Sequence, residues 1–481
     1  MRVPRCDSQF RVQSAILEGT VAAPLNFLPY KNQSGLWKHM ATQCAVPLLS
    51  SDEYHFREDR LKEILREVNE GGYSPSKPLG FLSAPKQHSV ARFVPVFSYK
   101  DTAVYFSCLQ CVDQKLAEAA VEHTFGGWKL GGARRADEER QALELFNGED
   151  SESIPLSCYN RGAWVQAWNQ FWKLIAANHE HADDQAWFAM FDIANFYDSV
   201  DLHRLENSVR AASAGCQFPM NVLFHLLRTW NKGRCLYSES TKGLPMDVVG
   251  DCSRLLANFY LTAFDTKFRE DAISSGGDYM RYADDMVIRA GSEAICKELV
   301  YRASERLHGL GLNINVAKVR YCSKSAFNSY WGFVAMDRFE SDDLEGGMTM
   351  LRSIIQNEEF GRKPTALKRA ITLVSKSSSP DIQKWRNWTR ERAISDGLPL
   401  HLSREQILSF IRLYDRPAIA LELLVPLFIN QPFSQPKAVF VRALQSFKGP
   451  AAEQVSDYRD AMYAHIVELR DPVLDLCIAA A

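Results

Sequence analysis

The sequence has little that would place it in a membrane or outside the cell. Its longest apolar run, AIALELLVPLFI at residues 418–429, is too short to span a bilayer and contains Glu422 and Pro426. The N-terminal residues MRVPRCDSQFRVQ have no apolar stretch of the kind that a secretory signal needs. We therefore expect a cytoplasmic protein with no membrane association.

The cysteines lack the spacing of a metal or disulfide framework. The chain has 11 cysteines, but the one close pair, Cys108 and Cys111, has no second CxxC and no histidine at the spacing of a zinc site. This pattern favours reduced thiols over structural zinc, as expected in the cytosol.

An excess of charge of either sign is also missing. Lys and Arg total 56, Asp and Glu total 58, and the net charge is -2. This balance neither demands nor excludes nucleic acid, because a basic cleft can lie on a neutral body. With 481 residues, of which 46% are hydrophobic, the chain is long enough for two to four folded units.

Several segments carry local signals of helices and strands. REDRLKEILREVNE (57–70) predicts a helix that stops at Gly71-Gly72, and alternating apolar residues from Val90 to Tyr99 predict strands. Further predictions are an apolar strand at 187–192, a buried helix at 253–268, a helix with Ile295, Leu299, Ala303 and Leu307 on one face, and a strand pair at YWGFVAMD (330–337).

The strand signals stop beyond about residue 340. The Ser-rich stretch SKSSSPD, residues 375–381, predicts a linker, and the residues after it read as helices. Ser403 and Gln406 form a capping-box pattern before an apolar run. A stack of helix pairs is one reading of 381–481, and the sequence does not indicate its function.

The stretch RYADDMVIR, residues 281–289, places Asp284 and Asp285 side by side between two short apolar runs. Such a pair is most often a polar hairpin tip, because Asp suits turns. The functional alternative requires a cation that offsets the repulsion and predicts a third carboxylate elsewhere, since divalent metals take several oxygen ligands.

A third carboxylate is present at the end of the strand predicted for 187–192. If this strand and the hairpin are neighbours in one antiparallel sheet, Asp192, Asp284 and Asp285 converge at one edge. Two divalent cations held there would activate a 3′-hydroxyl and stabilise a pyrophosphate leaving group. The all-oxygen ligand set favours Mg²⁺ over zinc, with Mn²⁺ as an alternative.

At this point the chain resembles the reverse transcriptase family over roughly residues 75–340. FDIANFYDSVD resembles the first catalytic motif, YADD (282–285) the second metal motif, and GLPMDVVGDCSRLLANFYL the segment between them. LGLNINVAKV, WGF (331–333) and PKQHSVARFVPVFSYKD resemble the later lysine motif, the primer grip and the fingers strands.

The resemblance implies an RNA-directed DNA polymerase with a right-hand fold of α+β class. It implies an N-terminal helical extension at 1–74, fingers and palm at 75–335, a thumb at 336–375 and a helical C-terminal domain at 376–481. The implied site residues are Asp192, Ile193, Asp284 and Asp285 as metal ligands, Lys318 near the leaving pyrophosphate, Lys86, Arg92, Tyr197, Gly243 and Pro245 around the nucleotide, and Trp331, Gly332 and Phe333 on nucleic acid.

Each match alone has a plainer alternative. Arg92 is more often a solvated strand residue, and Lys318 a charge beside a helix. Tyr197 on its own would be a core aromatic, and Trp331 and Phe333 ordinary strand packing. The order of the six segments along the chain is what favours the functional reading.

The turn after Gly-Leu departs from the common family pattern. Pro245 is followed by Met246 and Asp247 instead of Gln-Gly, and about two residues are inserted before Ser253. This departure and the helical C-terminal part resemble the bacterial defence-associated reverse transcriptases of the unknown and abortive-infection groups. That likeness implies a structured non-coding RNA and a DNA product, with a homo-oligomer or a second defence protein left open as partners.

Two functions other than RNA-templated DNA synthesis remain as alternatives. Relatives of this kind include template-independent and protein-primed DNA polymerases. A catalytically idle scaffold that binds RNA or nucleotides is the alternative from another class, and the three intact aspartates argue against it.

FGGWKLGGARRADEER, residues 125–140, carries two glycine pairs and a basic end. It is read either as a surface loop with a solvated basic end, which we favour slightly, or as a mobile loop that contacts phosphate and stacks on a base. The tryptophans between 164 and 187 are read as core.

Overall fold

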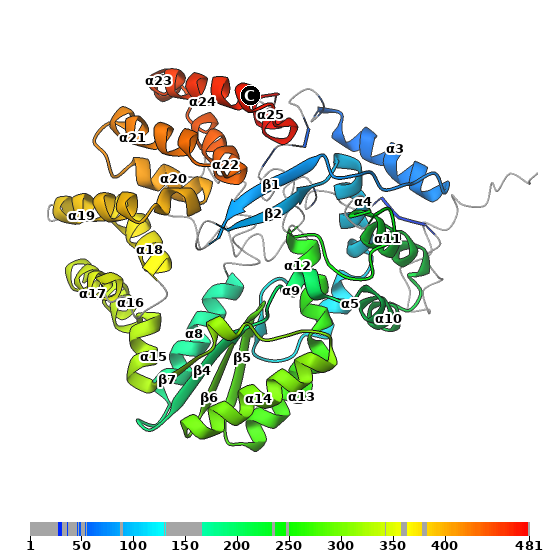
Figure 1. The fold of residues 1–481 in the computed structure, drawn as a ribbon, viewed down its shortest axis with the longest axis horizontal. Helices are drawn as coiled ribbons and strands as arrows, with labels where there is room; N and C mark the ends of the chain where they lie inside the picture. The colour runs from blue at the N-terminus through cyan, green and yellow to red at the C-terminus, as the bar shows by residue number, and fades with distance from the viewer. Residues whose placement is uncertain are drawn as a thin grey trace, which may run out of the picture.

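The computed structural model describes residues 27–30, 36, 46, 48, 49, 53, 55–86, 90–128, 130, 166–232, 236–246, 250–341, 343–356, 363–377 and 382–479. Within them, a five-stranded sheet and a two-stranded sheet are surrounded by helices, as Figure 1 shows. None of the described helices combines the length and the apolarity that a membrane span requires.

The larger sheet has the strand order β3-β5-β6-β4-β7. Its strands are β3 (Thr124–Phe125), β4 (Trp187–Asp192), β5 (Asp278–Tyr282), β6 (Asp285–Ala290) and β7 (Arg320–Ser323). β4 pairs antiparallel with β6 and β7, β5 and β6 form an antiparallel hairpin, and β3 joins β5 in parallel. The predicted strand at 187–192 and the hairpin around the Asp pair are therefore confirmed as neighbours.

β4 is apolar along its length because both faces of the sheet are covered. Phe188 and Met190 face a cluster that includes helix α8 (Gln166–Glu180), whereas Ala189 and Phe191 belong to the main core. The helices α13 (Thr262–Ser274) and α14 (Glu293–Gly309) pack against the strands on the main-core side. Asp192 is the last residue of β4, so its carboxylate lies at the end of this interior strand.

The smaller sheet is the antiparallel pair β1 (Gly80–Pro85) and β2 (Ala91–Val96), which confirms the strand prediction within 90–99. It packs on the C-terminal helices, because Leu82, Val94 and Val96 share one apolar cluster with them. The backbone N–H of Ser83 donates to Ser434 Oγ, and that of Ser434 donates to Ser83 Oγ, each over 2.8 Å.

The remaining helices build the surroundings of the two sheets. On the N-terminal side and around the larger sheet they are α3 (Arg57–Asn69), α4 (Tyr99–Gln110), α5 (Asp113–Glu118), α9 (Phe196–Ser199), α10 (Leu202–Ala212), α11 (Gln217–Thr229) and α12 (Gly250–Tyr260). α3 confirms the helix predicted at 57–70. The buried helix predicted at 253–268 is instead two helices, since α12 ends at Tyr260 and α13 begins at Thr262.

The C-terminal part is helical and runs as an arc that returns to the β1–β2 hairpin (Figure 1). Its helices are α16 (Phe333–Glu340), α17 (Leu344–Gln356), α18 (Lys363–Lys376), α19 (Ile382–Ser395), α20 (Arg404–Ile411), α21 (Pro417–Asn430), α22 (Ser434–Gln445), α23 (Pro450–Gln454), α24 (Ser456–Leu469) and α25 (Pro472–Ala479). The capping box of Ser403 and Gln406 is confirmed at the start of α20. Most of the predicted linker, residues 378–381, lies outside the described residues.

The strand pair predicted at 330–337 is wrong. Residues Lys324–Trp331 form helix α15, which Ser323 caps by accepting a hydrogen bond from the backbone N–H of Ala326. Gly332 ends it in a left-handed conformation, with φ of 69°, and α16 begins at Phe333. Trp331, one of the aromatic residues that suggested strands, instead packs under the sheet beside Phe327, which lies one helical turn before it in α15.

Candidate active site

Three carboxylates lie together at one end of the interior strands of the five-stranded sheet. Asp192 pairs in register with Asp285, and Asp284 lies in the two-residue turn between β5 and β6. The Asp192 side chain is only 4% exposed, and its Oδ1 atom is buried without a hydrogen-bond partner among the described residues. A buried acceptor of this kind is costly unless a cation or donor meets it.

The three carboxylates influence one another electrostatically. Burial, and then the charges of Asp285 and Asp192, together raise the pKa of Asp284 to about 6. This arrangement disfavours three ionised carboxylates unless a positive charge lies among them. It is therefore chemically suited to a cation.

Lys318 supplies a positive charge at this end of the strands. Its Nζ atom donates to Asp192 Oδ2, although the lysine side chain itself is 60% exposed. Burial lowers the pKa of Lys318, but the hydrogen bond to Asp192 and the charges of the aspartates outweigh it, so that its pKa is raised overall.

The segment that carries Lys318 is tied directly to the end of β4. The backbone N–H of Asn315 donates to the Asp192 carbonyl, and that of Ala194 donates to the Asn313 carbonyl, each over 2.8 Å. Ile193 forms an isolated bridge with Ile314. These contacts explain why LGLNINVAKV, far along the chain, delivers its lysine to Asp192.

The β1–β2 hairpin brings two more cations toward the same carboxylates. Burial, then the charges of Arg92 and Lys318, lower the pKa of Lys86, while Asp198 and Asp192 partly offset them. Lys86 and Arg92 are both exposed and flank the hairpin tip, whose residues 87–89 are not described. The structure thus places Lys86 within electrostatic reach of both Arg92 and Lys318.

The residues predicted around the sugar and base also meet. The backbone N–H of Leu244 donates to the Tyr197 carbonyl, and that of Gly243 donates to the Val200 carbonyl, each over 2.9 Å. Gly243 has φ of 98°, which a side chain would strain, and the Pro245 carbonyl accepts from Ser253 Oγ. The Tyr197 ring is half-buried on α9.

Trp331, Gly332 and Phe333 are not part of this group. The two rings are 8% and 5% exposed and lie parallel at 6.3 Å between centroids, in the cluster under the sheet that contains Phe171 and Phe188. Both rings are therefore packed inside the protein, as the plainer alternative expects. They pack from helices, however, and not from the strands that the alternative assumed.

The sequence reasoning missed one group directly behind the Asp pair. Arg281, the residue before YADD, is fully buried and pairs with Asp265 of α13, which is also fully buried. The sequence did contain a signal of this pair, which is a charged residue inside an apolar strand. Charged residues are rarely buried unless they are paired.

Part of the glycine-rich segment read as a loop also lies behind the Asp pair. Phe125 belongs to β3, and its carbonyl accepts from the backbone N–H of Ala283 over 3.0 Å. Residues 131–140 of that segment lie outside the described residues, so the reading of its basic end is untested. The described beginning packs against the palm.

The residues present fit a bound divalent cation. As the described residues stand, no group of three or more His, Cys, Asp and Glu side chains is arranged to hold a metal ion. However, the buried Oδ1 of Asp192, the mutual effect on Asp284 and an all-oxygen donor set are the features that Mg²⁺ or Mn²⁺ requires.

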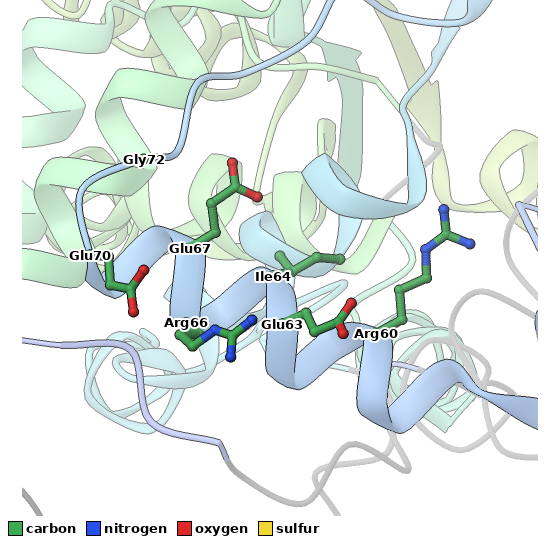
Figure 2. Close-up of a pocket in the computed structure, with 7 residues that line it drawn as sticks. All are labelled: Arg60, Glu63, Ile64, Arg66, Glu67, Glu70 and Gly72. Atoms are coloured by element: carbon green, nitrogen blue, oxygen red, sulfur yellow. The ribbon is translucent and has the colours of Figure 1, made fainter.

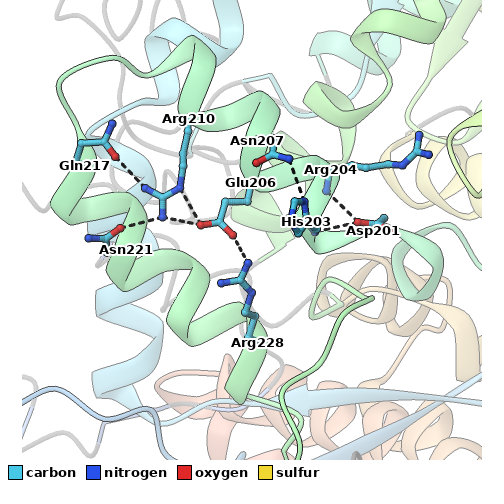
Figure 3. Close-up of polar contacts among 9 residues, drawn as sticks. All are labelled: Asp201, His203, Arg204, Glu206, Asn207, Arg210, Gln217, Asn221 and Arg228. Carbon is cyan, nitrogen blue, oxygen red and sulfur yellow. Dashed lines mark hydrogen bonds and ion pairs between the residues drawn. The ribbon is translucent and has the colours of Figure 1, made fainter.

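Two other polar features lie elsewhere. A surface hollow of about 670 Å³ follows α3, where Figure 2 shows side chains of both charges, among them Glu63, Arg66 and Glu70. No predicted site residue lines it. In Figure 3, Glu206 of α10 is paired with Arg210 and with Arg228 of α11, which joins the two helices.

Comparison with known proteins agrees with this geometry. The family described as "Reverse transcriptase (RNA-dependent DNA polymerase)" matches residues 142–338, a stretch that contains Asp192, Asp284, Asp285 and Lys318. The chain contains a reverse transcriptase domain. The match over residues 142–338 indicates the predicted enzyme class, RNA-directed DNA polymerase, and the right-hand polymerase fold of α+β class, and the structure shows that the part after it is helical.

Solved structures similar to this chain include telomerases. Apo telomerase from Candida tropicalis, truncated from the C-terminal domain, has 13% identity and a TM-score of 0.32 over 52% of this chain and 51% of its own. The apo telomerase of the same organism has 10% identity and a TM-score of 0.33 over 88% and 76%.

Telomerase from Candida albicans in complex with a TWJ fragment of telomeric RNA has 8% identity and a TM-score of 0.32 over 79% of this chain and 65% of its own. The chain thus spans about half of the length of the first of these structures. The comparison with curated protein sequences gave no match.

Proposed function

We propose that the whole chain synthesises DNA from deoxynucleotides on an RNA template, with Asp192, Asp284 and Asp285 as the reaction centre. The observation that carries this proposal is the register of the palm sheet, which sets Asp192 opposite Asp285 and leaves a buried Asp192 oxygen free to bind a cation. The reverse transcriptase domain supports the same reaction.

Asp192, the Ile193 carbonyl, Asp284 and Asp285 would hold the divalent ions. When bound, two such ions activate a 3′-hydroxyl and stabilise the pyrophosphate that leaves. Mg²⁺ suits these hard oxygen ligands, and Mn²⁺ is the alternative ion.

The cationic side chains would bind the triphosphate. Lys86 and Arg92 lie at the hairpin tip, where the charges of Arg92 and Lys318 both act on Lys86. A lysine that now offsets the charge of Asp192 can serve phosphate oxygens once another cation takes its place at that carboxylate. Lys318 would thus move between two anionic partners.

Tyr197 would discriminate between sugars. Its ring is half-buried on the turn that follows β4, beside the Gly243–Pro245 segment. A bulky ring there excludes a ribose 2′-hydroxyl by shape.

The biological setting is the finer part of the proposal. The altered residues after Pro245 and the helical C-terminal part favour a cytoplasmic bacterial enzyme of antiphage defence that works with a structured non-coding RNA. The telomerase structures include one with bound RNA, which is consistent with nucleic acid as partner. A second protein or self-association is left open by this proposal.

The test is incorporation of labelled dNTPs by the purified chain, with Asp284→Ala as the control. Synthesis on a primed RNA template with Mg²⁺, and none by the variant, is the expected result. Equal synthesis without template would identify the template-independent alternative, and no synthesis by either protein would favour the scaffold. Sequencing the RNA and DNA that copurify with the chain then tests the RNA partner.

A further inference from the structure

The turn that carries Asp284 has an unfavourable backbone. It has two residues, Ala283 and Asp284, and Ala283 has φ of 52°. Glycine is the residue that accepts this left-handed region without cost, whereas an L-residue there is strained by about 1–2 kcal/mol. A strained turn persists only where its surroundings hold it.

Both backbone groups of Ala283 are held by the protein. Its N–H donates to the Phe125 carbonyl over 3.0 Å, and its carbonyl accepts from Arg281 Nη1 over 2.7 Å. The residue immediately before Asp284 is thus fixed from two sides, by β3 and by a side chain of β5.

Arg281 is itself fixed by a set of buried contacts. Its Nε and Nη2 atoms donate to the two carboxylate oxygens of Asp265 over 2.8 and 2.5 Å. Its Nη1 atom donates to Asn258 Oδ1 over 2.7 Å, and Tyr279 Oη donates to the same Asp265. The planar guanidinium fork can satisfy these directions together, which a lysine cannot.

The network continues to the glycine pair beside the turn. Asn258 Nδ2 donates to the Gly126 carbonyl. Gly126 has φ of 100°, and a Cβ atom there would lie 2.8 Å from the Ala283 backbone nitrogen. Gly126 therefore allows β3 to approach the turn closely enough to bind it.

We propose that Gly126, Asn258, Asp265 and Arg281, here called the turn network, position the Asp284 carboxylate for cation binding. A buried ion pair is weak evidence for stability, because well-packed apolar residues often serve as well. The fork of Arg281, however, is directed at the Ala283 carbonyl, and Gly126 is required only by the approach to that same residue. This inference rests on the proposed function, and its residues act through Asp284 without touching substrate.

Two adjacent glycines offer a matched test. Gly126 and Gly127 have φ of 100° and 93°, and at either one a Cβ atom would meet a neighbour at 2.8 Å. For Gly126 the neighbour is the Ala283 backbone, whereas for Gly127 it is the Arg254 side chain. Gly126→Ala and Gly127→Ala should therefore lower the melting temperature alike.

The decisive measurement is Mn²⁺ binding to the full chain without nucleotide, followed by electron paramagnetic resonance. Gly126→Ala is expected to weaken Mn²⁺ affinity about tenfold or more, as loss of a supporting contact around ligands does, and Gly127→Ala by less than about twofold. Equal Mn²⁺ affinities in the two variants, at equal melting temperatures, would overturn the positioning role.

A second pair covers the case in which Gly126→Ala does not fold. Arg281→Lys keeps the buried charge beside Asp265 but loses the fork, whereas Arg289→Lys changes a half-exposed pair with Asp278 on the same hairpin. Only Arg281→Lys should lose Mn²⁺ affinity, and unchanged affinity would count against the proposal. Wild-type chain that binds no Mn²⁺ and makes no DNA would instead refute the proposed function, and the positioning role with it.

Discussion

The two sides of the Ala283–Asp284 turn hold two cation–carboxylate pairs that differ in their exposure to water. Behind the turn, Arg281 and Asp265 are both 0% exposed, and the guanidinium is held by several acceptors. In front of it, Lys318 is 60% exposed, and Asp192 keeps a second oxygen without a partner among the described residues.

This difference separates a permanent pair from an exchangeable one. A buried pair cannot trade partners without leaving a charge in the protein interior. A solvated ammonium on a flexible stem can leave its carboxylate at little cost. The back pair, Arg281–Asp265, therefore suits a structural role, and the front pair, Lys318–Asp192, suits chemistry.

The strongest test of the front side is removal of one carboxylate. Asp192→Ala and Asp284→Ala are expected to abolish DNA synthesis with Mg²⁺, because each removes a ligand from the cation site. Both variants should stay folded, since removing one carboxylate reduces repulsion among the others. Full activity of either purified variant would contradict the polymerase assignment, and circular dichroism controls for the fold.

Removing the carboxylate of the back pair should lower the stability of the fold. Asp265→Ala leaves the Arg281 charge buried and unpaired, which costs about 3–5 kcal/mol. Urea unfolding of Asp265→Ala beside Asp192→Ala measures the contrast. If Asp265→Ala were as stable as wild type, the back pair would not be the permanent one.

The raised pKa of Asp284, on the front side, predicts that the stability of the protein depends on pH. Burial and the neighbouring carboxylates raise the pKa of Asp284 from 3.8 to about 6, so the folded state binds more protons than the unfolded state between these values. Stability without metal should thus fall as pH rises through this window. At about pH 7.5 in EDTA, Asp284→Asn should be more stable than wild type by up to about 3 kcal/mol.

This gain should shrink as the pH falls from about 6 to 3.8 and should vanish below that window, where the wild-type carboxyl is protonated in both states. Asp278→Asn, at the far end of the same hairpin, is a control whose partner is Arg289. A gain for Asp284→Asn that does not change with pH would mean that burial of Asp284 is not its cause.

Tyr197 should affect selectivity more than stability. Because the ring is half-buried, Tyr197→Ala should cost well below the roughly 3–5 kcal/mol of a fully buried aromatic, and it should incorporate ribonucleotides far more readily. Comparing dNTP and rNTP incorporation with the melting temperature separates the two effects. Unchanged sugar preference in a folded variant would remove Tyr197 from the site.

The smallest change in stability is expected at Lys318. Loss of its exposed pair with Asp192 should alter unfolding by less than about 1 kcal/mol in Lys318→Met. Without nucleotide, Mn²⁺ should bind this variant more tightly, because the ammonium no longer competes for Asp192, yet DNA synthesis should fall. Weaker Mn²⁺ binding would show that the front pair is not exchangeable.

Local patterns were sufficient to predict the carboxylate edge of the palm. The apolar run before Asp192 predicts a strand, and the paired aspartates between two apolar runs predict a hairpin. The antiparallel pairing of β4 with β6 then brings the carboxylates together. The error at 330–337 has a physical reason. Aromatic residues favour strands by composition, but Phe327 and Trp331 are one helical turn apart, and Gly332 supplies the helix end.

The turn network could not be predicted from spacing. Gly126, Asn258 and Arg281 come from distant segments, and only the tertiary fold puts the Arg281 fork between Asp265 and the Ala283 carbonyl. An arginine inside an apolar strand indicates a buried partner but does not say which one. For the same reason, nothing in the sequence connects Ser83 with Ser434.

The paired hydrogen bonds between Ser83 and Ser434 join the fingers hairpin to α22, and a Cβ atom on Gly80 would meet Val473 of α25 at 2.3 Å. The hairpin that carries Lys86 and Arg92 therefore has its mechanical support at the far end of the chain. A displacement of the hairpin would therefore have to break or carry along its contacts with α22 and α25. A chain cut after α18 would expose Leu82, Val94 and Val96, so the hairpin depends for its burial on helices that come about 300 residues later in the sequence.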